Sequence, residues 1–184
     1  MHAHDDAPSP WIERFAPLVP PGARLLDLAA GRGRHARLFA ARGASVLAVD
    51  RDAAALSCLA GTPGITCRVV DLEGPAWPLA GQTFDAVVVA HYLYRPRLRD
   101  LLGTLRPHGV LLYETFADGN ARFGRPSNPD FLLRRDELLD LVREPPALTV
   151  VAFEQGWARI GTREAVVQRV AAVGPANPWP SPLP

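Results

Sequence analysis

Apolar runs of strand length recur along this chain at spacings that leave room for a helix between one run and the next. Seven runs have this character, at residues 24–30, 44–50, 65–71, 85–93, 109–116, 148–155 and 164–173. Helical patterns follow four of them, at residues 34–42, 51–60, 96–105 and 134–142. Strands that alternate with helices predict a mostly parallel sheet with helices on both faces. The runs are nearly continuous in apolar residues, which agrees, because such a sheet is buried on both sides.

The last two runs break this alternation. Only the segment GWARIGTR, residues 156–163, separates them, and it is too short for a crossover helix. We therefore expect these two runs to pair antiparallel. The predicted fold is α/β, with a seven-stranded, mostly parallel sheet and an antiparallel final strand.

A sheet of this kind binds ligands beyond the carboxyl ends of its strands, at the switch point between the first and fourth strands. The residues that follow each strand are therefore the candidates for a binding site. They are residues 27–33, 50–52, 71–73, 91–95 and 114–125.

Composition limits the possible partners. The chain has 184 residues, of which 48% are hydrophobic, enough for one folded domain at residues 1–174. We expect residues 1–8 to be flexible and the proline-rich tail at 175–184 to lie extended. The net charge of +1 gives no electrostatic case for nucleic acid or an anionic membrane as the main partner. All twenty basic residues are arginine, which excludes a Schiff-base or P-loop lysine.

No metal site is expected. Cys58 and Cys67 are the only cysteines, their spacing fits no zinc site, and we expect both to pack as small buried thiols. His2 and His4 lie beside two aspartates, but a frayed terminus accounts for them.

The N-terminus lacks the apolar core of a signal peptide, and no apolar run approaches the ~20 residues that span a bilayer. The expected location is the cytoplasm.

The segment LLDLAAGRGRHARLFAARG, residues 25–43, reads as a strand, a glycine turn and a helix. Taken as G-R-G-R-H-A, the turn fits a dinucleotide-binding fingerprint, and taken as D-L-A-A-G-R-G it fits a different nucleoside cofactor. Both interpretations use Gly31 and Gly33 for close backbone approach, and both use Asp50, 19 positions after Gly31, for ribose hydroxyls. These features alone do not separate the two.

Three other features favour the second interpretation. Asp27 lies at the end of the first strand, where a carboxylate suits an ammonium or sulfonium group better than a pyrophosphate. Asp71 ends the third strand, where it can accept a hydrogen bond from an adenine amino group. The antiparallel hairpin at the end also departs from the all-parallel sheet of dinucleotide-binding dehydrogenases.

These motifs resemble those of class I S-adenosylmethionine-dependent methyltransferases, and within that class the small bacterial enzymes related to the tellurite-resistance methyltransferases. The resemblance covers residues 25–173 and rests on LLDLAAGRGRHARLFA, VLAVDRDAAAL, VVDLE and FDAVVVAHYLYRPRL, in that order. It implies a Rossmann-like three-layer sandwich, S-adenosylmethionine as cofactor, S-adenosylhomocysteine as product, and no metal.

The resemblance also implies roles for individual positions. Asp27 would serve the methionine amino group, and Asp50 would take the ribose hydroxyls. The full set of implied cofactor residues is Asp27, Ala29, Gly31, Gly33, Asp50, Arg51, Asp71, Leu72, Ala90 and His91. Ala29 departs from the commonest form, which has glycine, and we expect this to be a mild change if φ is negative there. A helix N-cap is the alternative role for Asp50 or Asp71 taken alone.

The substrate side follows the fourth and fifth strands. The fourth strand ends AHYLYRP and lacks the Asn/Asp-Pro-Pro-Tyr signature of amino-group methylases, which argues against DNA adenine methylation. His91 could act as a base or an orienting donor, and Arg95 could hold an anion. Tyr92 and Tyr94 either line the pocket or pack under a helix.

A long loop follows the fifth strand, and loops of this length are often lids. Its Arg122 and Arg125 flank Phe123, and we expect the arginines to grip an anion while the phenylalanine excludes water. A stiff connector is the alternative. Arg134 and Arg135 are expected to be surface charges at the end of the next helix.

The function expected from the sequence is methyl transfer from S-adenosylmethionine to a small-molecule nucleophile, such as an oxyanion or a thiol. Two alternatives stay open: a non-catalytic S-adenosylmethionine-binding regulatory protein, and an NAD(P)-dependent oxidoreductase. Nucleic acid and membranes are not expected partners, and the sequence leaves the oligomeric state and the need for a general base undecided.

Overall fold

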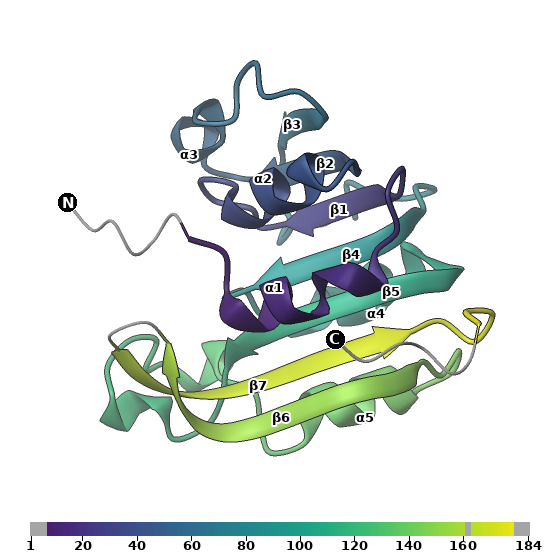
Figure 1. Ribbon diagram of the computed structural model, residues 1–184. Coiled ribbons are helices and arrows are strands. Elements are labelled where there is room, and N and C mark those ends of the chain that lie inside the picture. The colour runs from purple at the N-terminus through teal and green to yellow at the C-terminus, as the bar shows by residue number, and fades with distance from the viewer. Residues whose placement is uncertain (1–6, 161–162, 179–184) are drawn as a thin grey trace.

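The computed structural model describes residues 7–160 and 163–178 and contains the seven-stranded sheet that the sequence predicts (Figure 1). The strand order is β3-β2-β1-β4-β5-β7-β6. The strands are β1 Arg24–Leu28, β2 Ser45–Asp50, β3 Ile65–Val69, β4 Phe84–Ala90, β5 Leu105–Phe116, β6 Thr149–Ile160 and β7 Arg163–Val173.

The pairing confirms the mixed sheet. β1 pairs in parallel with β2 and with β4, and β2–β3 and β4–β5 are also parallel. β7 pairs antiparallel with both β5 and β6. From β1 the chain adds β2 and β3 on one side, and it then returns to add β4 and β5 on the other side of β1. The switch point therefore lies between the neighbouring strands β1 and β4. The segment expected as a link, residues 156–163, is mostly strand, because β6 and β7 pair as far as Ile160 and Arg163.

The described chain has five α-helices and four short 3-10 helices, and α1 and η1 precede β1. The α-helices are α1 Pro10–Phe15, α2 Arg34–Ala41, α3 Ala53–Ser57, α4 Leu98–Gly103 and α5 Glu137–Arg143; the 3-10 helices are η1 Ala16–Leu18, η2 Arg95–Arg97, η3 Asn120–Arg122 and η4 Pro129–Phe131. α5 begins three residues later than expected, because Asp136 has a left-handed φ of 62° and breaks the helical pattern. Within residues 7–160 and 163–178, none of the helices is long and apolar enough to cross a membrane.

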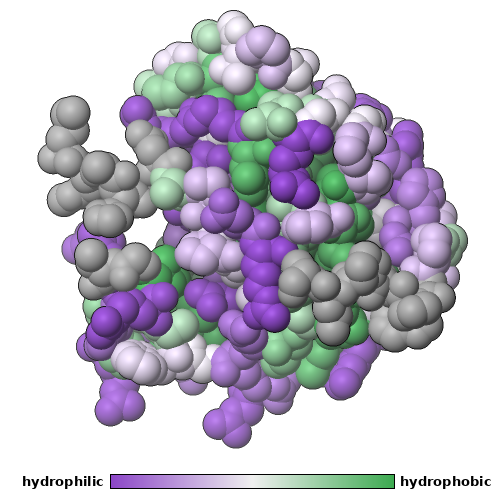
Figure 2. All heavy atoms as spheres, viewed as in Figure 1, coloured by the Kyte–Doolittle hydropathy of each residue, from purple (hydrophilic) through white to green (hydrophobic). Residues whose placement is uncertain are grey.

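The helices cover the two faces of the sheet as two separate layers (Figure 1). On one face, Phe15 of α1, Phe39 of α2 and Leu56 of α3 pack into one apolar core. On the other face, Leu98 of α4 and Leu138 of α5 belong to a second core. Figure 2 shows the first face, where hydrophilic residues are numerous over the β6–β7 hairpin. The three-layer sandwich expected from the sequence is confirmed.

Helix α1 was not predicted, although the sequence carries its signal. Ser9 caps the helix by accepting a hydrogen bond from the backbone N–H of Trp11, and Pro10 takes the first helical position. The backbone N–H of Ser9 donates to Nε2 of His35 on α2, at 3.1 Å. Burial, helped by the neighbouring charges of Arg34 and His91, lowers the pKa of His35 to about 3, so this acceptor is neutral.

Two expectations about the periphery are wrong within the described residues. Cys58 and Cys67 are exposed rather than buried, because α3 is short and β3 is the edge strand. The start of the tail is a turn rather than an extended segment: Ala176 N–H donates to the Pro107 carbonyl, and Asn177 Nδ2 donates to the His108 carbonyl, both at 2.8 Å. The remaining tail residues 179–184, and the segment 1–6 with His2 and His4, lie outside the described residues.

Candidate functional site

A cleft of about 400 Å³ lies beyond the carboxyl ends of the parallel strands, at the switch point. This volume is within the range of small-molecule sites. Its described lining consists of Ala29, Asp50, Arg51, Val70, Asp71, Leu72, Glu73, His91, Tyr92, Leu93, Thr115, Phe116, Pro126 and Phe131. Six of the residues predicted from the sequence to bind cofactor line this cleft: Ala29, Asp50, Arg51, Asp71, Leu72 and His91.

The turn after β1 has the backbone shape of a ligand-approach loop. Ala29, Gly31 and Gly33 all have positive φ, at 56°, 54° and 76°. A side chain is strained there, and at Gly33 it would also meet Leu59 within 2.7 Å. The condition for a mild change at Ala29, a negative φ, is not met, so this alanine carries backbone strain. Strain of this kind is typical of functional sites.

Asp50 closes the turn from the end of β2. Its Oδ2 accepts a hydrogen bond from the Gly31 N–H at 2.7 Å, and its Oδ1 accepts one from the Asp52 N–H at 2.9 Å. The cap of α3 is Asp52, which accepts from Ala54 and Ala55. The alternative reading of Asp50 as a helix cap is therefore wrong. It is a cleft-facing carboxylate that also fixes the glycine turn.

Asp71 follows β3, and its Oδ1 accepts a hydrogen bond from the Glu73 N–H at 2.9 Å. No helix follows β3, so Asp71 is not a helix cap either. The bond instead shapes the chain around Leu72, which is buried and lines the cleft. Arg51 and Glu73 lie at the same end, which makes this half of the cleft charged.

Asp27 lies in the strand beneath the turn and is 1% exposed. It does not line the cleft directly. Burial raises its pKa to about 7, against the opposing effects of the Ala36 backbone N–H and the Arg34 charge. Its Oδ2 has no hydrogen-bond partner among the described residues. A buried acceptor without a donor is costly unless a ligand or water supplies one.

His91 follows β4 and lines the cleft with a left-handed φ of 56°. Its ring lies 4.8 Å from that of Phe116, between centroids, and is tilted by 32°. Nδ1 is 3.3 Å from Nη2 of Arg34, and Nε2 is 3.8 Å from Oε1 of Glu114, which is completely buried. Ala90 ends β4 and does not line the cleft itself.

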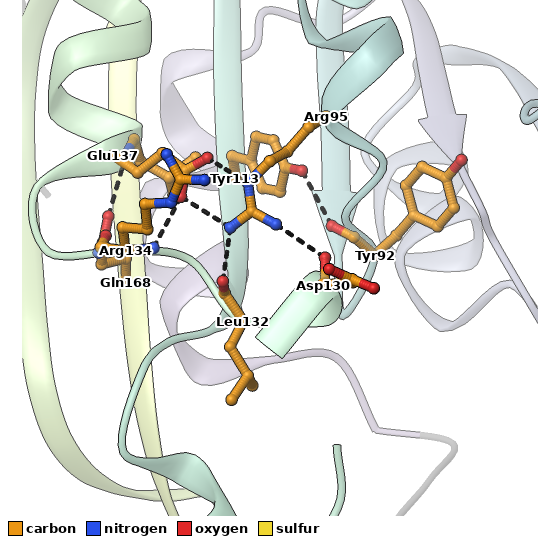
Figure 3. Close-up of polar contacts among 9 residues, drawn as sticks. Tyr92, Arg95, Tyr113, Asp130, Leu132, Arg134, Glu137 and Gln168 are labelled. Atoms are coloured by element: carbon orange, nitrogen blue, oxygen red, sulfur yellow. Dashed lines mark hydrogen bonds and ion pairs between the residues drawn. The ribbon is translucent and has the colours of Figure 1, made fainter. Parts of the chain in front are cut away.

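Of the other residues predicted after β4, only Tyr92 lines the cleft. Its buried hydroxyl has no partner among the described residues, and burial raises its pKa. The Tyr94 hydroxyl donates to the Glu73 carbonyl at 3.4 Å, outside the cleft. The Tyr92 carbonyl in turn accepts a hydrogen bond from the buried Tyr113 hydroxyl at 2.9 Å (Figure 3).

Arg95 is not available as an anion binder. Nε and Nη2 bind the two carboxylate oxygens of Glu137 at 2.6 and 2.9 Å. Nη1 donates to the Asp130 carbonyl at 2.8 Å, and Nη2 donates to the Leu132 carbonyl at 2.6 Å (Figure 3). Although burial opposes it, this pairing lowers the pKa of Glu137. The structure contradicts the expected anion-holding role of Arg95, because four of its five N–H groups donate to Glu137, Asp130 and Leu132.

The long loop reaches the cleft through residues other than those predicted. Pro126 and Phe131 line the cleft, whereas Arg122, Phe123 and Arg125 do not. Arg134 is held through its backbone: its N–H donates to Glu137, and its carbonyl accepts from Gln168 (Figure 3). Thr115 and Phe116 lie within the candidate range 114–125 but were given no role, and Phe131 was missed. Phe116 lies directly at the carboxyl end of β5, which is the signal that could have found it.

The described residues include no group of three or more His, Cys, Asp or Glu that could hold a metal ion. The cleft lining itself combines charged, aromatic and hydroxyl side chains.

Comparison with known proteins agrees with this geometry. Residues 25–109, from β1 into β5, match the family described as Methyltransferase domain. The demethylmenaquinone methyltransferase of Corynebacterium urealyticum is 31% identical over 151 residues, which cover 79% of this chain and 60% of that protein.

Solved structures share the fold. TehB from Haemophilus influenzae matches with a TM-score of 0.72 and 16% identity, over 86% of this chain and 59% of that chain. A TehB-like S-adenosylmethionine-dependent methyltransferase from Corynebacterium glutamicum matches with a TM-score of 0.64 and 18% identity, over 90% and 88% of the two chains. This chain thus spans about 60% of the length of its curated relative and of TehB. Residues 25–109 resemble a methyltransferase domain in sequence. The fold of the chain resembles that of the class I S-adenosylmethionine-dependent methyltransferases, TehB among them.

Proposed function

We propose that this protein transfers a methyl group from S-adenosylmethionine to a small molecule bound in the cleft. The observation that carries the proposal is the set of three aspartates, Asp27, Asp50 and Asp71, at or just beyond the carboxyl ends of β1, β2 and β3, with Asp50 bound to the strained glycine turn. The similar proteins from Corynebacterium urealyticum and Corynebacterium glutamicum support the proposal, because both are named as methyltransferases.

The residues present fit the cofactor. The orphaned, buried Oδ2 of Asp27 suits an ammonium group, reached directly or through a water molecule. Gly31 and Gly33 have the positive φ that lets backbone approach a ligand. S-adenosylmethionine, when bound, supplies an electrophilic methyl group on a sulfonium.

The chain's own work is then binding and alignment. Each oxygen of the Asp50 carboxylate accepts one internal hydrogen bond and retains capacity for a ribose hydroxyl. Asp71 and the Leu72 backbone would read the adenine edge. His91 and Phe116 line the other end of the cleft, where an acceptor would be held in line with the methyl group.

A small acceptor fits this cleft best. The lining comes from the ends of single strands and one loop, and the net charge of +1 offers no footprint for a nucleic acid. The curated relative is named for a demethylmenaquinone, which supports a small organic acceptor. The antiparallel β7 argues against the oxidoreductase alternative, because dinucleotide-binding dehydrogenase sheets are all parallel.

Calorimetry tests the cofactor first. We expect the protein to bind S-adenosylmethionine and S-adenosylhomocysteine, and not NAD. Asp50→Ala should weaken binding by about 1.5–3 kcal/mol, the scale of hydrogen bonds to a charged group. Asp52→Ala is the matched control: it removes the α3 cap, at a cost of about 1 kcal/mol in stability, and leaves binding intact.

Release of S-adenosylhomocysteine in the presence of candidate acceptors then tests the activity. Heat on titration with NAD alone would contradict the proposal. Tight S-adenosylmethionine binding with no acceptor methylated would favour the regulatory alternative.

A further inference from the structure

The two halves of the cleft differ in charge. Its charged lining, as far as the described residues go, consists of Asp50, Arg51, Asp71 and Glu73, and all four lie at or just beyond the ends of β2 and β3. The other half lies at the ends of β4 and β5 and beside the long loop, and it is lined by His91, Tyr92, Leu93, Thr115, Phe116, Pro126 and Phe131. That second half presents no carboxylate and no guanidinium from the described chain.

Phe131 is the outer wall of this second half. Its side chain is 50% exposed, which is unusual for a large apolar residue that the chain also holds in place. Its two neighbours, Asp130 and Leu132, both give their carbonyls to Arg95 as hydrogen-bond acceptors. Phe131 is therefore fixed on both sides by one guanidinium.

The Arg95 clamp is itself anchored. Glu137 at the start of α5 pairs with Arg95 through both carboxylate oxygens and also accepts the Arg134 N–H at 2.7 Å (Figure 3). Such a planar, two-point pair holds geometry more firmly than a single contact. Pro126, the other loop residue in the lining, has its carbonyl bound by Asn120 Nδ2 at 2.9 Å. The loop wall is thus preorganised at both contact points.

The inner wall is the ring pair of His91 and Phe116, with centroids 4.8 Å apart. The backbone N–H of His91 donates to the Glu114 carbonyl at 2.9 Å, which holds this ring at the end of the sheet. Arg34 lies against Nδ1 of His91 but does not line the cleft. Aromatic walls favour flat rings, because stacked or tilted ring contacts add to the burial of apolar area.

We propose that the second half of the cleft binds a flat, uncharged ring as the methyl acceptor, with Phe131 as the ring-contacting wall and Arg95 as the residue that positions it. This inference rests on the proposed function and replaces the oxyanion expected from the sequence. An oxyanion is bound best by a guanidinium, and the lining of this half presents none: Arg95 is paired with Glu137, and Arg122 and Arg125 lie outside the lining.

The test measures acceptor binding rather than turnover. Protein saturated with S-adenosylhomocysteine is titrated with 2-naphthol and catechol as ring probes, and with selenite as an oxyanion probe, by calorimetry. We expect the ring probes to bind and selenite not to bind. Phe131→Ala should weaken 2-naphthol about tenfold, the scale of one aromatic contact. Phe123→Ala is the matched control, because Phe123 is 41% exposed on the same loop and does not line the cleft.

Arg95→Gln separates positioning from direct contact. It should weaken the ring probe to a similar extent while S-adenosylhomocysteine affinity stays within about twofold, and Arg95→Lys should recover only part of the loss, because an ammonium lacks the planar fork. Arg99→Gln, which removes an 85% exposed arginine nearby, is its control. Selenite binding without ring binding, ring binding by no probe, or equal losses from Phe131→Ala and Phe123→Ala would each overturn the inference. If S-adenosylhomocysteine itself fails to bind, it is the proposed function that fails.

Discussion

Glu114 and Arg169 are direct cross-strand partners in the β5–β7 ladder, and the Arg169 Nε lies 2.6 Å from the Glu114 carboxylate. The glutamate side chain is completely buried and the arginine side chain is 13% exposed. Neither carboxylate oxygen accepts an aligned hydrogen bond from the described residues, so the arginine charge is what stabilises the buried carboxylate. The same carboxylate lies behind His91 of the cleft.

Removal of Arg169 alone should lower the free energy of unfolding far more than removal of both Glu114 and Arg169. Arg169→Met leaves a buried, uncompensated charge and should lower the free energy of unfolding by about 3–5 kcal/mol. The double variant Glu114→Leu/Arg169→Met should recover most of this loss. Urea unfolding of the two variants measures the difference. Arg159→Met, which breaks an exposed pair on the same hairpin, should cost under about 1 kcal/mol. A double variant as unstable as the single would contradict this account.

Ala29 is strained, and glycine should relieve that strain. Because its φ is 56°, Ala29→Gly should stabilise the fold by about 0.5–1 kcal/mol, the left-handed penalty less the added entropy of the unfolded chain. Ala30→Gly, whose parent residue has no positive φ, should destabilise it by a similar amount. Thermal unfolding of the parent protein and the two variants at one pH measures both changes in stability. Equal effects from the two substitutions would mean that the strain at Ala29 is negligible.

His35 should make the fold sensitive to acid. Its folded pKa of about 3 lies below the ordinary 6.5, so the unfolded chain binds the extra proton between these values. The associated stability is complete above pH 6.5 and is lost as pH falls toward 3, by about 2 kcal/mol between pH 7 and pH 5. His35→Gln keeps a side-chain acceptor near Ser9 and should lack this loss. The parent and variant unfolding curves at both pH values give the difference, and parallel losses would refute the prediction.

Asp27 should make cofactor binding depend on pH near neutrality, because its carboxyl group titrates there. Burial raises its pKa to about 7, and Arg34 and Asp50 are the charged groups that act on it. An ammonium ligand needs the carboxylate form, so S-adenosylhomocysteine affinity should rise as pH increases from 6 to 8. Binding at pH 6.5 should release protons, which calorimetry in buffers of different ionisation enthalpy detects. Asp27→Asn should abolish the proton release, and an unchanged release would assign it to another group.

The sequence was sufficient for the parts of this fold that depend on periodicity. Continuous apolar runs identified all seven strands, and the short link at residues 156–163 identified the antiparallel hairpin. The acidic residues at strand ends were found in the same way, because the carboxyl ends of parallel strands meet at one edge. Asp50 and Asp71 therefore appear in the cleft where they were expected.

The substrate side could be predicted only at His91 and Tyr92, because the rest of it depends on contacts between distant segments. Arg95 and Glu137 are 42 positions apart, and only their pairing shows that the arginine is a clamp and not an anion binder. The same holds for Phe131, whose place in the lining follows from a loop fold that no local pattern specifies. The positive φ of Ala29 is equally invisible in a sequence where alanine normally prefers negative φ.

The placement of β7 between β5 and β6 has a consequence for how the chain is made. β6 has no sheet neighbour except β7, yet it precedes β7 in the chain. During synthesis from the N-terminus, β5 must keep an open edge and β6 must wait unpaired until residues 163–173 have left the ribosome. The sheet therefore closes only once this last strand is available, and a nascent chain stalled before it exposes two unpaired strand edges to aggregation.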